Sequence, residues 1–187
     1  MEPFSSIHVP SQFGTITIIW QDTTDKTKVH RLLLPHEGVS TSELAAKNHR
    51  NVMHQPSPPI AQLAHRIQRF LEGEAVEFDL NILALDQCHP FQRRVLLAEY
   101  SIPRGWVSTY GRIARHLGVS GGARAVGNAL ARNPFPIIIP CHRAIRSDWE
   151  LGGFRGGIEM KRRLLEREGI EFSPAGKVVT KRVYYST

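Results

Sequence analysis

The chain of 187 residues has little cysteine and no long apolar runs. Its two cysteines, Cys88 and Cys141, are too few for a disulfide framework and make a poor structural zinc site. No apolar stretch approaches a membrane span, and residues 1–10 lack the basic and apolar regions of a secretory signal. We therefore expect a protein of a reducing, intracellular setting, with no membrane association and no metal.

Positive charge is concentrated in the second half of an otherwise ordinary globular composition. Residues 1–87 carry 7 basic and 10 acidic side chains, whereas residues 88–172 carry 14 basic and 7 acidic ones, and 13 of those 14 are arginine. Residues 173–187 add 3 basic side chains and no acidic one. This asymmetry favours a polyanion such as nucleic acid as the partner, the alternative being that the arginines only keep helices soluble.

The first half of the chain predicts a small α/β unit. Its patterns predict strands at residues 14–20 and 29–34, a helix fragment with a loop at 38–59, a helix at 60–71 and a short strand at 75–80. The two longer strands are expected to form a hairpin through a turn at residues 24–26. Gly73 is expected to end the helix.

The second half predicts a mostly helical unit. The expected helices cover residues 90–100, 110–117, 123–132 and 159–168. Ser108 or Thr109 can cap the second of these helices, and Pro134 ends the third. Because the second and third helices are short and joined by a tight turn that contains glycine, they predict a helix-turn-helix.

An apolar run from Pro136 to Pro140 leads directly into Cys141, His142 and Arg143. Such a run predicts a buried strand or a packed extended segment, so the thiol would follow a rigid, dehydrated element. An imidazole and a guanidinium beside a thiol can both favour the nucleophilic thiolate. The competing interpretation is that a lone cysteine after an apolar run is a small core residue.

The predicted helix at residues 123–132 is dominated by alanine and glycine. Base readout in the major groove requires long polar side chains, so this helix is suited to a close approach to a backbone or a narrow groove rather than to reading sequence. Tight helix packing would use the same small residues. Arg124 favours the first interpretation, because it is a long cation among residues too small to cover it.

These motifs together resemble one protein family. The stretches Tyr110 to Ala114, Ala123 to Gly127, Asn133-Pro134 and Ile139 to Arg143 are similar in order and spacing to the methylated-DNA–protein-cysteine methyltransferases, also called O6-alkylguanine-DNA alkyltransferases. The similarity runs over about residues 90–169. The first half resembles the family more weakly, at residues 14–16 and 70–73.

The resemblance implies catalytic roles for five residues. Cys141 would accept the alkyl group once, His142 would draw off its proton through a water, and Glu168 would orient His142. Asn133 would hold the turn before the active-site strand, and Tyr110 would hydrogen-bond the flipped purine and push its phosphate. Such a relay predicts a lowered pKa for the Cys141 thiol and fast reaction near neutral pH.

The resemblance also implies the surfaces that meet DNA and the damaged base. Arg124 would enter the duplex and fill the gap that the flipped base leaves. The expected DNA-binding residues are Arg124, Tyr110, Ala123, Gly127 and Arg143. The loop at residues 149–157 would wall the pocket, with the Arg155 backbone amide near the guanine oxygen. The expected pocket residues are Pro136, Trp149, Phe154 and Arg155.

The implied function is DNA repair by direct reversal. The alkyl group of O6-alkylguanine, and also of O4-alkylthymine, in double-stranded DNA would pass irreversibly and once to Cys141, with no cofactor and no metal. A thiolate suits displacement at an alkyl carbon, and a stacked base must be flipped to be reached. We expect a monomer that binds the minor groove without sequence preference, in the cytoplasm with the nucleoid of a prokaryote or in the nucleus of a eukaryote.

The implied fold is α/β (α+β). A small ribonuclease H-like sheet-and-helix domain is expected at residues 1–87 and a winged-helix-like helix-turn-helix domain at 88–172. A basic tail at 173–187 could touch DNA, and a frayed tail is the alternative that we favour. The chain departs from the family pattern at Trp149, where the loop usually has glycine, and at Phe154, where tyrosine is common. These changes bear on pocket size and alkyl range.

Three other functions are compatible with parts of the pattern. A lesion sensor of the same fold would bind damage without repairing it, but such relatives lack the cysteine. A transcription regulator would use the helix-turn-helix, but its recognition helix should be polar. A thiol hydrolase with a Cys-His-Glu relay would turn over on a small substrate, whereas an alkyl acceptor is consumed.

Overall fold

The computed structural model describes residues 4–24, 26–35 and 55–185, which form two compact units. One unit comprises Met1–Leu85 with Pro134–Ile138, and the other comprises Asp86–Asn133 with Ile139–Thr187. The sequence-based division instead gave residues 134–138 to the second domain. They join the first unit because the Leu32 backbone N–H donates to the Pro134 carbonyl at 2.8 Å. Within the described ranges, no helix has the length and apolar character needed to cross a membrane.

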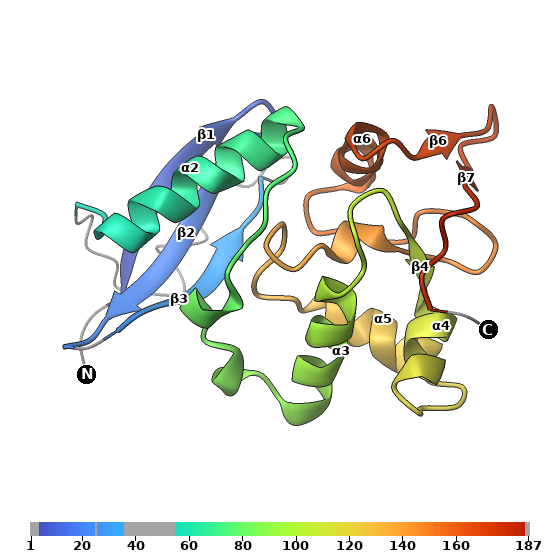
Figure 1. The fold of residues 1–187 in the computed structure, drawn as a ribbon, viewed down its shortest axis with the longest axis horizontal. Helices are drawn as coiled ribbons and strands as arrows, with labels where there is room; N and C mark the ends of the chain where they lie inside the picture. The colour runs from blue at the N-terminus through green and yellow to red at the C-terminus, as the bar shows by residue number, and fades with distance from the viewer. Residues whose placement is uncertain (1–3, 25, 36–54, 186–187) are drawn as a thin grey trace. The chain divides into compact units, whose positions relative to one another are not determined.

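The first unit contains a three-stranded antiparallel sheet in the order β1-β2-β3 (Figure 1). Its strands are β1 (Ser5–Ser11), β2 (Gly14–Asp22) and β3 (Thr27–Leu33). The two predicted strands and their hairpin are confirmed as β2 and β3. Strand β1, which pairs with β2 from Ser5↔Trp20 to Ser11↔Gly14, was not predicted, because its serines, histidine and proline carry no strong β pattern.

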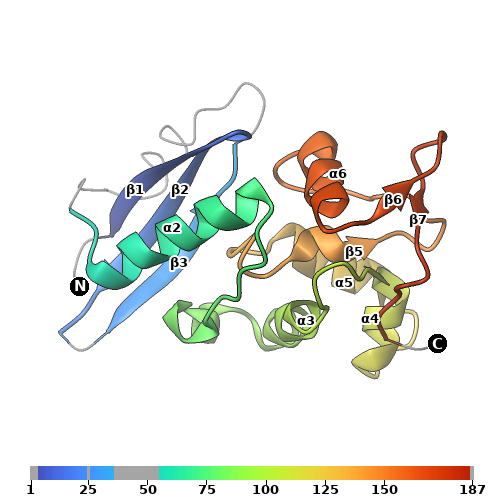
Figure 2. The same ribbon diagram turned by 45° about the horizontal axis from the view of Figure 1, so that its top comes forward.

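Helix α2 (Pro58–Glu72) lies across one face of this sheet, as Figures 1 and 2 show from two sides. It confirms the helix predicted at residues 60–71, and Gly73 ends it with a φ of 105°. Its buried side chains are Ile60, Leu63, Ile67, Phe70 and Leu71. The strand predicted at residues 75–80 is wrong: the chain there is irregular and leads into the short 3₁₀ helix η1 (Leu80–Ile82), capped by the Asp79 carboxylate. The prediction for residues 38–59 lies largely outside the described residues.

The second unit is mostly helical, as predicted. Its α-helices are α3 (Pro90–Tyr100), α4 (Tyr110–His116), α5 (Ala123–Ala131) and α6 (Ile158–Arg167), and its 3₁₀ turns are η2 (Leu85–Gln87), at the junction of the units, and η3 (Cys141–Arg143). The Thr109 side chain accepts from the Arg112 N–H and caps α4. Helices α4 and α5 pack against each other as a helix-turn-helix whose turn contains Gly118 and Gly121, both at positive φ.

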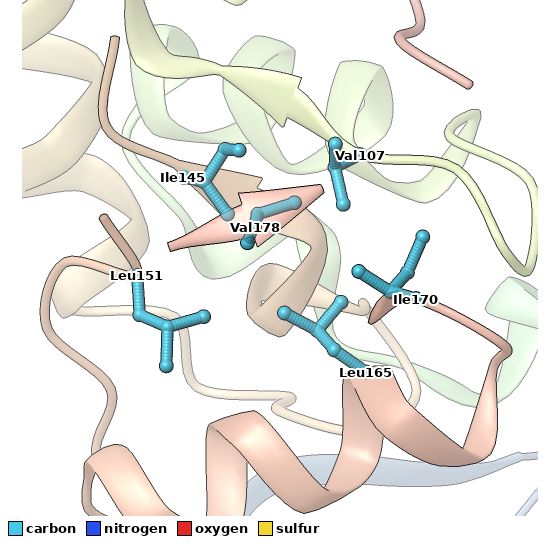
Figure 3. Close-up of a cluster of buried hydrophobic side chains, with 6 residues drawn as sticks. All are labelled: Val107, Ile145, Leu151, Leu165, Ile170 and Val178. Carbon is cyan, nitrogen blue, oxygen red and sulfur yellow. The ribbon is translucent and has the colours of Figure 1, made fainter. Parts of the chain in front are cut away.

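Two short parallel strands position the residues that the sequence singled out. Strand β4 (Ser108–Thr109) pairs with β5 (Ala144–Ile145) in the register Thr109↔Ile145. Tyr110 follows β4 directly and Cys141 precedes β5 by one 3₁₀ turn, so the pair joins the helix-turn-helix to the Cys-His-Arg turn. The strands rest on a core cluster drawn in Figure 3, formed by Val107, Ile145, Leu151, Leu165, Ile170 and Val178.

The basic tail is packed within the second unit, so the frayed tail that we favoured is wrong. Strand β7 (Val178–Val179) pairs with β6 (Glu171–Phe172), and Val183 forms a parallel bridge with Val107. Tyr185 donates its hydroxyl to the Ala98 carbonyl at 2.7 Å and stacks on His116 at 3.9 Å. Aromatic burial and these hydrogen bonds fix a segment whose charge had suggested a free end.

The apolar run at residues 136–140 is buried, but it is not a strand. The chain turns at Ile137 and Ile138, and Ile137 has a φ of 75°. This conformation is uncommon for a β-branched residue and is held here by packing, since both isoleucines are 1% exposed. The thiol therefore follows a buried turn rather than the end of a strand.

Candidate active site

Cys141 begins the turn η3, and one carbonyl anchors the chain at that point. The Ile139 carbonyl accepts the Cys141 N–H at 2.8 Å and the Asn133 side-chain amide at 3.1 Å. Asn133 is 1% exposed, whereas Cys141 keeps part of its surface open. The structure thus brings Asn133 to the turn that carries the thiol.

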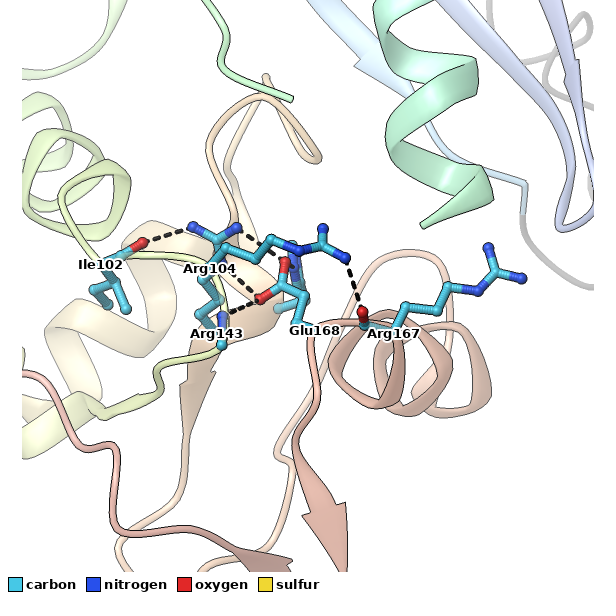
Figure 4. Close-up of polar contacts among 7 residues, drawn as sticks. Ile102, Arg104, Arg143, Arg167 and Glu168 are labelled. Carbon is cyan, nitrogen blue, oxygen red and sulfur yellow. Dashed lines mark hydrogen bonds and ion pairs between the residues drawn. The ribbon is translucent and has the colours of Figure 1, made fainter. Parts of the chain in front are cut away.

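The side chains of His142, Arg143 and Glu168 form a buried polar cluster, and the first two residues directly follow Cys141 in the chain. Figure 4 shows Arg143 and Glu168 of this cluster. His142 Nε2 lies 3.0 Å from Glu168 Oε1 and donates to the carboxylate. Arg143 donates to both oxygens of the same carboxylate at 2.9 Å, a two-point contact with fixed geometry. The Gly105 N–H adds a contact to Glu168 Oε2 at 3.3 Å, and Arg143 Nη1 donates to the Ile102 carbonyl at 2.6 Å.

The pKa values of this cluster make His142 a base and leave Cys141 a thiol. Burial lowers the pKa of His142 despite the nearby Glu168 carboxylate, so the imidazole is neutral at neutral pH and can accept a proton. Burial would raise the pKa of Glu168, but His142 and Arg143 outweigh it and hold the pKa at about 2. Burial raises the pKa of Cys141 to about 11, although the Asn133 side chain opposes the rise. The predicted lowering of the Cys141 pKa is therefore wrong, because dehydration outweighs the opposing effects of Asn133 and Lys161.

Tyr110 lies between the helix-turn-helix and the loop after β5. A Cβ placed on Gly127 of α5 would lie 3.9 Å from the Tyr110 ring, and one on Gly152 would come within 2.8 Å of the Tyr110 hydroxyl. Gly152, at a φ of 70°, therefore allows an approach that a larger residue would block. Burial, together with the nearby Glu99 and Cys141, raises the pKa of Tyr110 to about 12, so the phenol keeps its proton and can donate it in a hydrogen bond.

The expected DNA-facing residues divide into an exposed group and one buried exception. Ala123 and Arg124 are exposed at the start of α5, and Gly127 is half-buried one turn later. Arg143 was expected to bind DNA, but it is 8% exposed and its guanidinium is occupied by Glu168 and the Ile102 carbonyl. A bidentate pair with a buried carboxylate outweighs hydration of this cation, so Arg143 is part of the buried polar cluster and not of an exposed surface.

The expected pocket residues lie in different settings. The Phe154 ring meets His142 edge-on at 6.3 Å, and Arg155 is exposed. Trp149 is 37% exposed at a φ of 68°, the conformation that a glycine would adopt without strain. Pro136 is buried and belongs to the first unit, whereas the other three residues belong to the second.

Two buried ionisable residues of the second unit were missed. Lys161 on α6 and Glu99 on α3 are both 0% exposed. A signal was available, because each charge lies on the apolar stripe of its helix: Lys161 is one turn before Leu165, and Glu99 is one turn after Val95. A lysine or glutamate on such a stripe is either paired or functional.

The second cysteine has a local structural setting. Cys88 is half-buried, and burial raises the pKa of its thiol. Next to it, His89 Nδ1 accepts the Phe91 N–H and caps α3. In the parts of the chain that the structure describes, His, Cys, Asp and Glu side chains form no group of three or more that could hold a metal ion.

An open pocket of about 880 Å³ lies within the first unit. Its lining comes from the turn between β2 and β3, from α2 and from the segment around η1: Thr23, Thr24, Lys26, Thr27, Lys28, Pro59, Gln62, Leu63, Arg66, Phe78, Asp79, Asn81 and Ile82. This lining has no thiol and no imidazole. Its size alone therefore does not make this pocket the candidate active site, because it lacks the nucleophile and base that Cys141 and His142 offer.

Comparison with known proteins identifies this arrangement. Residues 90–170 match the model of the 6-O-methylguanine DNA methyltransferase, DNA binding domain. The methylated-DNA–protein-cysteine methyltransferase of Haemophilus influenzae is 35% identical over 163 residues, which cover 84% of this chain and 90% of that protein. The chain belongs to the methylated-DNA–protein-cysteine methyltransferase family.

Other members of the family match over more limited stretches or by structure. The member from Methanothermobacter thermautotrophicus is 50% identical over 116 residues, a match that spans 61% of this chain and 65% of that protein. The crystal structure of the Mycobacterium tuberculosis O6-methylguanine methyltransferase is 30% identical with a TM-score of 0.69, covering 88% of this chain and 92% of that one. A structure of the Mycobacterium tuberculosis protein in complex with DNA has a TM-score of 0.65 at 32% identity.

Proposed function

We propose that the protein repairs DNA by direct reversal, transferring the alkyl group of O6-alkylguanine, or of O4-alkylthymine, to its own Cys141. The observation that carries the proposal is the contact of 3.0 Å between His142 and Glu168, where His142 directly follows Cys141, a partly exposed residue. Family membership supports the reaction class, and the DNA complex of a relative supports a DNA substrate.

The proposed transfer begins with removal of the thiol proton. Neutral His142 accepts the Cys141 proton through a water, and ionised Glu168 stabilises the imidazolium that forms. Because the free thiol has a pKa of about 11, thiolate would form mainly when the substrate is in place. The nucleophile would thus be spared from adventitious alkylation until it is needed.

In the displacement, the Cys141 sulfur forms a bond to the alkyl carbon as the bond from that carbon to the guanine oxygen breaks. The proton that left the thiol ends on the guanine ring, which leaves as the neutral base rather than as an anion. Tyr110, whose phenol stays protonated, is proposed to donate a hydrogen bond to the purine without giving up its proton. The protein ends as a thioether, so each molecule acts once and no cofactor takes part.

Recognition of the lesion would use the helix-turn-helix. The exposed start of α5 combines small side chains, at Ala123 and half-buried Gly127, with one long cation, Arg124. The small side chains would allow close approach to the minor groove, and Arg124 could fill the gap that a flipped base leaves. Phe154 and the loop from Trp149 would border the extruded base. We expect a monomer without sequence preference, placed with the DNA of the cell: in the cytoplasm with the nucleoid, or in the nucleus of a eukaryote.

The decisive experiment is to incubate the protein with duplex DNA that contains O6-methylguanine and to weigh the intact protein. We expect one methyl group per molecule, mapped to Cys141. Cys141→Ser should abolish the mass gain, and the matched variant Cys88→Ser should retain it. Methylation of Cys88, or repeated turnover by an unmodified protein, would contradict the proposal.

A second experiment separates base flipping from chemistry. Arg124→Ala should slow repair of duplex DNA by about tenfold or more, while reaction with free O6-benzylguanine stays nearly unchanged, since only the duplex requires flipping. Arg132→Ala, at the opposite end of α5, is the matched control. Equal losses on both substrates would assign Arg124 a structural role.

A further inference from the structure

Glu99 is a buried carboxyl group without hydrogen-bond partners. It lies near the end of α3, is 0% exposed, and neither side-chain oxygen forms a hydrogen bond. Burying such a group costs stability, and cores rarely retain one without a reason. Its helix, α3, packs against the turn η3 that begins with Cys141, and the charge of the Glu99 carboxyl group acts on the Cys141 thiol.

Lys161 connects the segment after Cys141 to the loop at residues 149–157 through hydrogen bonds. Its buried ammonium donates to the carbonyls of Ala144 at 2.7 Å, Leu151 at 2.6 Å and Gly153 at 3.3 Å. Among the ion pairs of the described residues, none joins Lys161 to Glu99. The ammonium is therefore held by backbone carbonyls, and the carboxyl group acts on its surroundings at a distance.

The titratable and charged groups that interact electrostatically with Glu99 come from three elements and the tail. They are Cys141 and Arg143 on η3, Tyr110 on α4, Lys161 on α6 and Tyr185 in the tail. A negative charge at Glu99 raises the pKa of the Cys141 thiol, and the positive charge of Lys161 lowers it. The thiolate thus depends on the ionisation of both buried groups.

The two groups titrate in the same range. Burial raises the pKa of Glu99 to about 8, even though the positive charges of Lys161 and Arg143 favour the carboxylate. Burial lowers the pKa of Lys161 to about 8, against the effects of Cys141 and Glu99. Near neutral pH the carboxyl group is neutral and the ammonium is charged, a state that favours the thiolate. As the pH rises above about 8, both groups change in the direction that disfavours it.

We propose that Glu99 is a positioning residue for the reaction of Cys141, one that acts through its charge: protonated, it leaves the thiol reactive, and ionised, it suppresses the thiolate. This inference rests on the proposed function for its biological meaning. Its physical content concerns the thiol alone. Glu99→Gln keeps the size and removes the titration, so it isolates the charge.

The test follows the reaction of Cys141 with iodoacetamide and, separately, with free O6-benzylguanine, from about pH 6 to about pH 10. A Cys88→Ser background leaves Cys141 as the reporter. Near pH 7, Glu99→Gln and the parent should react within about twofold of each other, because the native carboxyl group is neutral there. Above about pH 9, Glu99→Gln should react about three to ten times faster, because in the parent the ionised Glu99 carboxylate raises the pKa of the Cys141 thiol. Glu159→Gln, at an exposed position on α6, is the control and should follow the parent throughout.

Two results would overturn the inference: superimposable pH profiles of Glu99→Gln and the parent, or a difference that is the same at every pH. An infrared spectrum of the parent gives an independent reading that does not require the variant to fold. It should contain the band of a protonated carboxylic acid at neutral pH, and its absence would refute the assignment.

The two reagents separate this inference from the proposed function. If O6-benzylguanine modifies Cys141 and the profiles coincide, the repair function stands and the role of Glu99 fails. If O6-benzylguanine does not react but the iodoacetamide profiles diverge, the role of Glu99 stands and the repair function fails.

Discussion

The two units differ in what they bury. Buried polar residues of the first unit are Ser5, Ser6 and Thr17, and its core is otherwise apolar, with Trp20 and five isoleucines at 0% exposure. Those of the second unit are Glu99, Ser108, Thr109, Asn133, His142, Arg143, Lys161 and Glu168. Among the described residues, every buried ionisable side chain of this set lies in the second unit.

This contrast separates stability from chemistry. Apolar burial in the first unit stabilises the fold without directed interactions. The second unit instead maintains charges away from water, each of which costs free energy unless a partner compensates it. Glu168 is compensated by His142 and Arg143, whereas Glu99 has no hydrogen-bonded partner. We infer that the second unit accepts a stability cost that its chemistry requires.

The largest expected effect comes from removing the compensated carboxylate. Glu168→Ala leaves His142 and Arg143 buried without their acceptor, so the free energy of unfolding should fall by about 3–5 kcal/mol, measured with denaturant. The alkyl-transfer rate should fall by about 100-fold as His142 loses its orientation. Glu168→Gln should be milder on both counts. The exposed pair of Glu74 with Arg69 in the first unit is the control, and Glu74→Gln should have no measurable effect. A stable and active Glu168→Ala protein would contradict the view that buried charges in the second unit matter more than the exposed pair in the first.

Lowering the pH should destabilise the second unit, because its buried carboxylate Glu168 then becomes protonated. The pKa of Glu168 is about 2 in the folded protein, below its ordinary value of 4.5, so its stabilisation is present above about pH 5 and is lost as the pH falls toward 2. The gap corresponds to about 3 kcal/mol. Chemical denaturation at several pH values should show this loss in the parent and not in Glu168→Gln. If the parent and Glu168→Gln lost the same stability in acid, a group other than Glu168 would be responsible for the loss.

A substitution in the apolar core should change stability alone. Ile67→Val on α2 removes one buried methylene group, and the free energy of unfolding should fall by about 1 kcal/mol. The alkyl-transfer rate of the folded protein should not change. If the rate fell with stability, the first unit would influence the chemistry, and the comparison would need revision.

The smallest expected effect concerns the tail. Tyr185→Phe removes the hydroxyl that donates to the Ala98 carbonyl and keeps the ring that stacks on His116. The free energy of unfolding should fall by about 0.5–1.5 kcal/mol. Phe172→Leu, at another half-buried aromatic position, provides a comparison that keeps every backbone contact. No change for Tyr185→Phe would mean that stacking alone holds the tail.

The sequence by itself determined the local elements and the family. Periodic apolar spacing, caps and glycines are short-range signals, so the helices of both units and the β2–β3 hairpin followed from them. The order of the motifs around Asn133 and Cys141 identified the family before any geometry was known. Strand β1 was not predicted, because its residues have a weak β preference and its formation depends on pairing with β2.

Only the tertiary structure decided how these residues behave. The burial of Arg143, the packing of Tyr185 and the turn at Ile137 all depend on contacts between segments far apart in the chain. The same is true of the Cys141 thiol: its neighbours in sequence are a base and a cation, yet burial sets its pKa. Dehydration is a property of the whole fold, and no stretch of sequence encodes it alone.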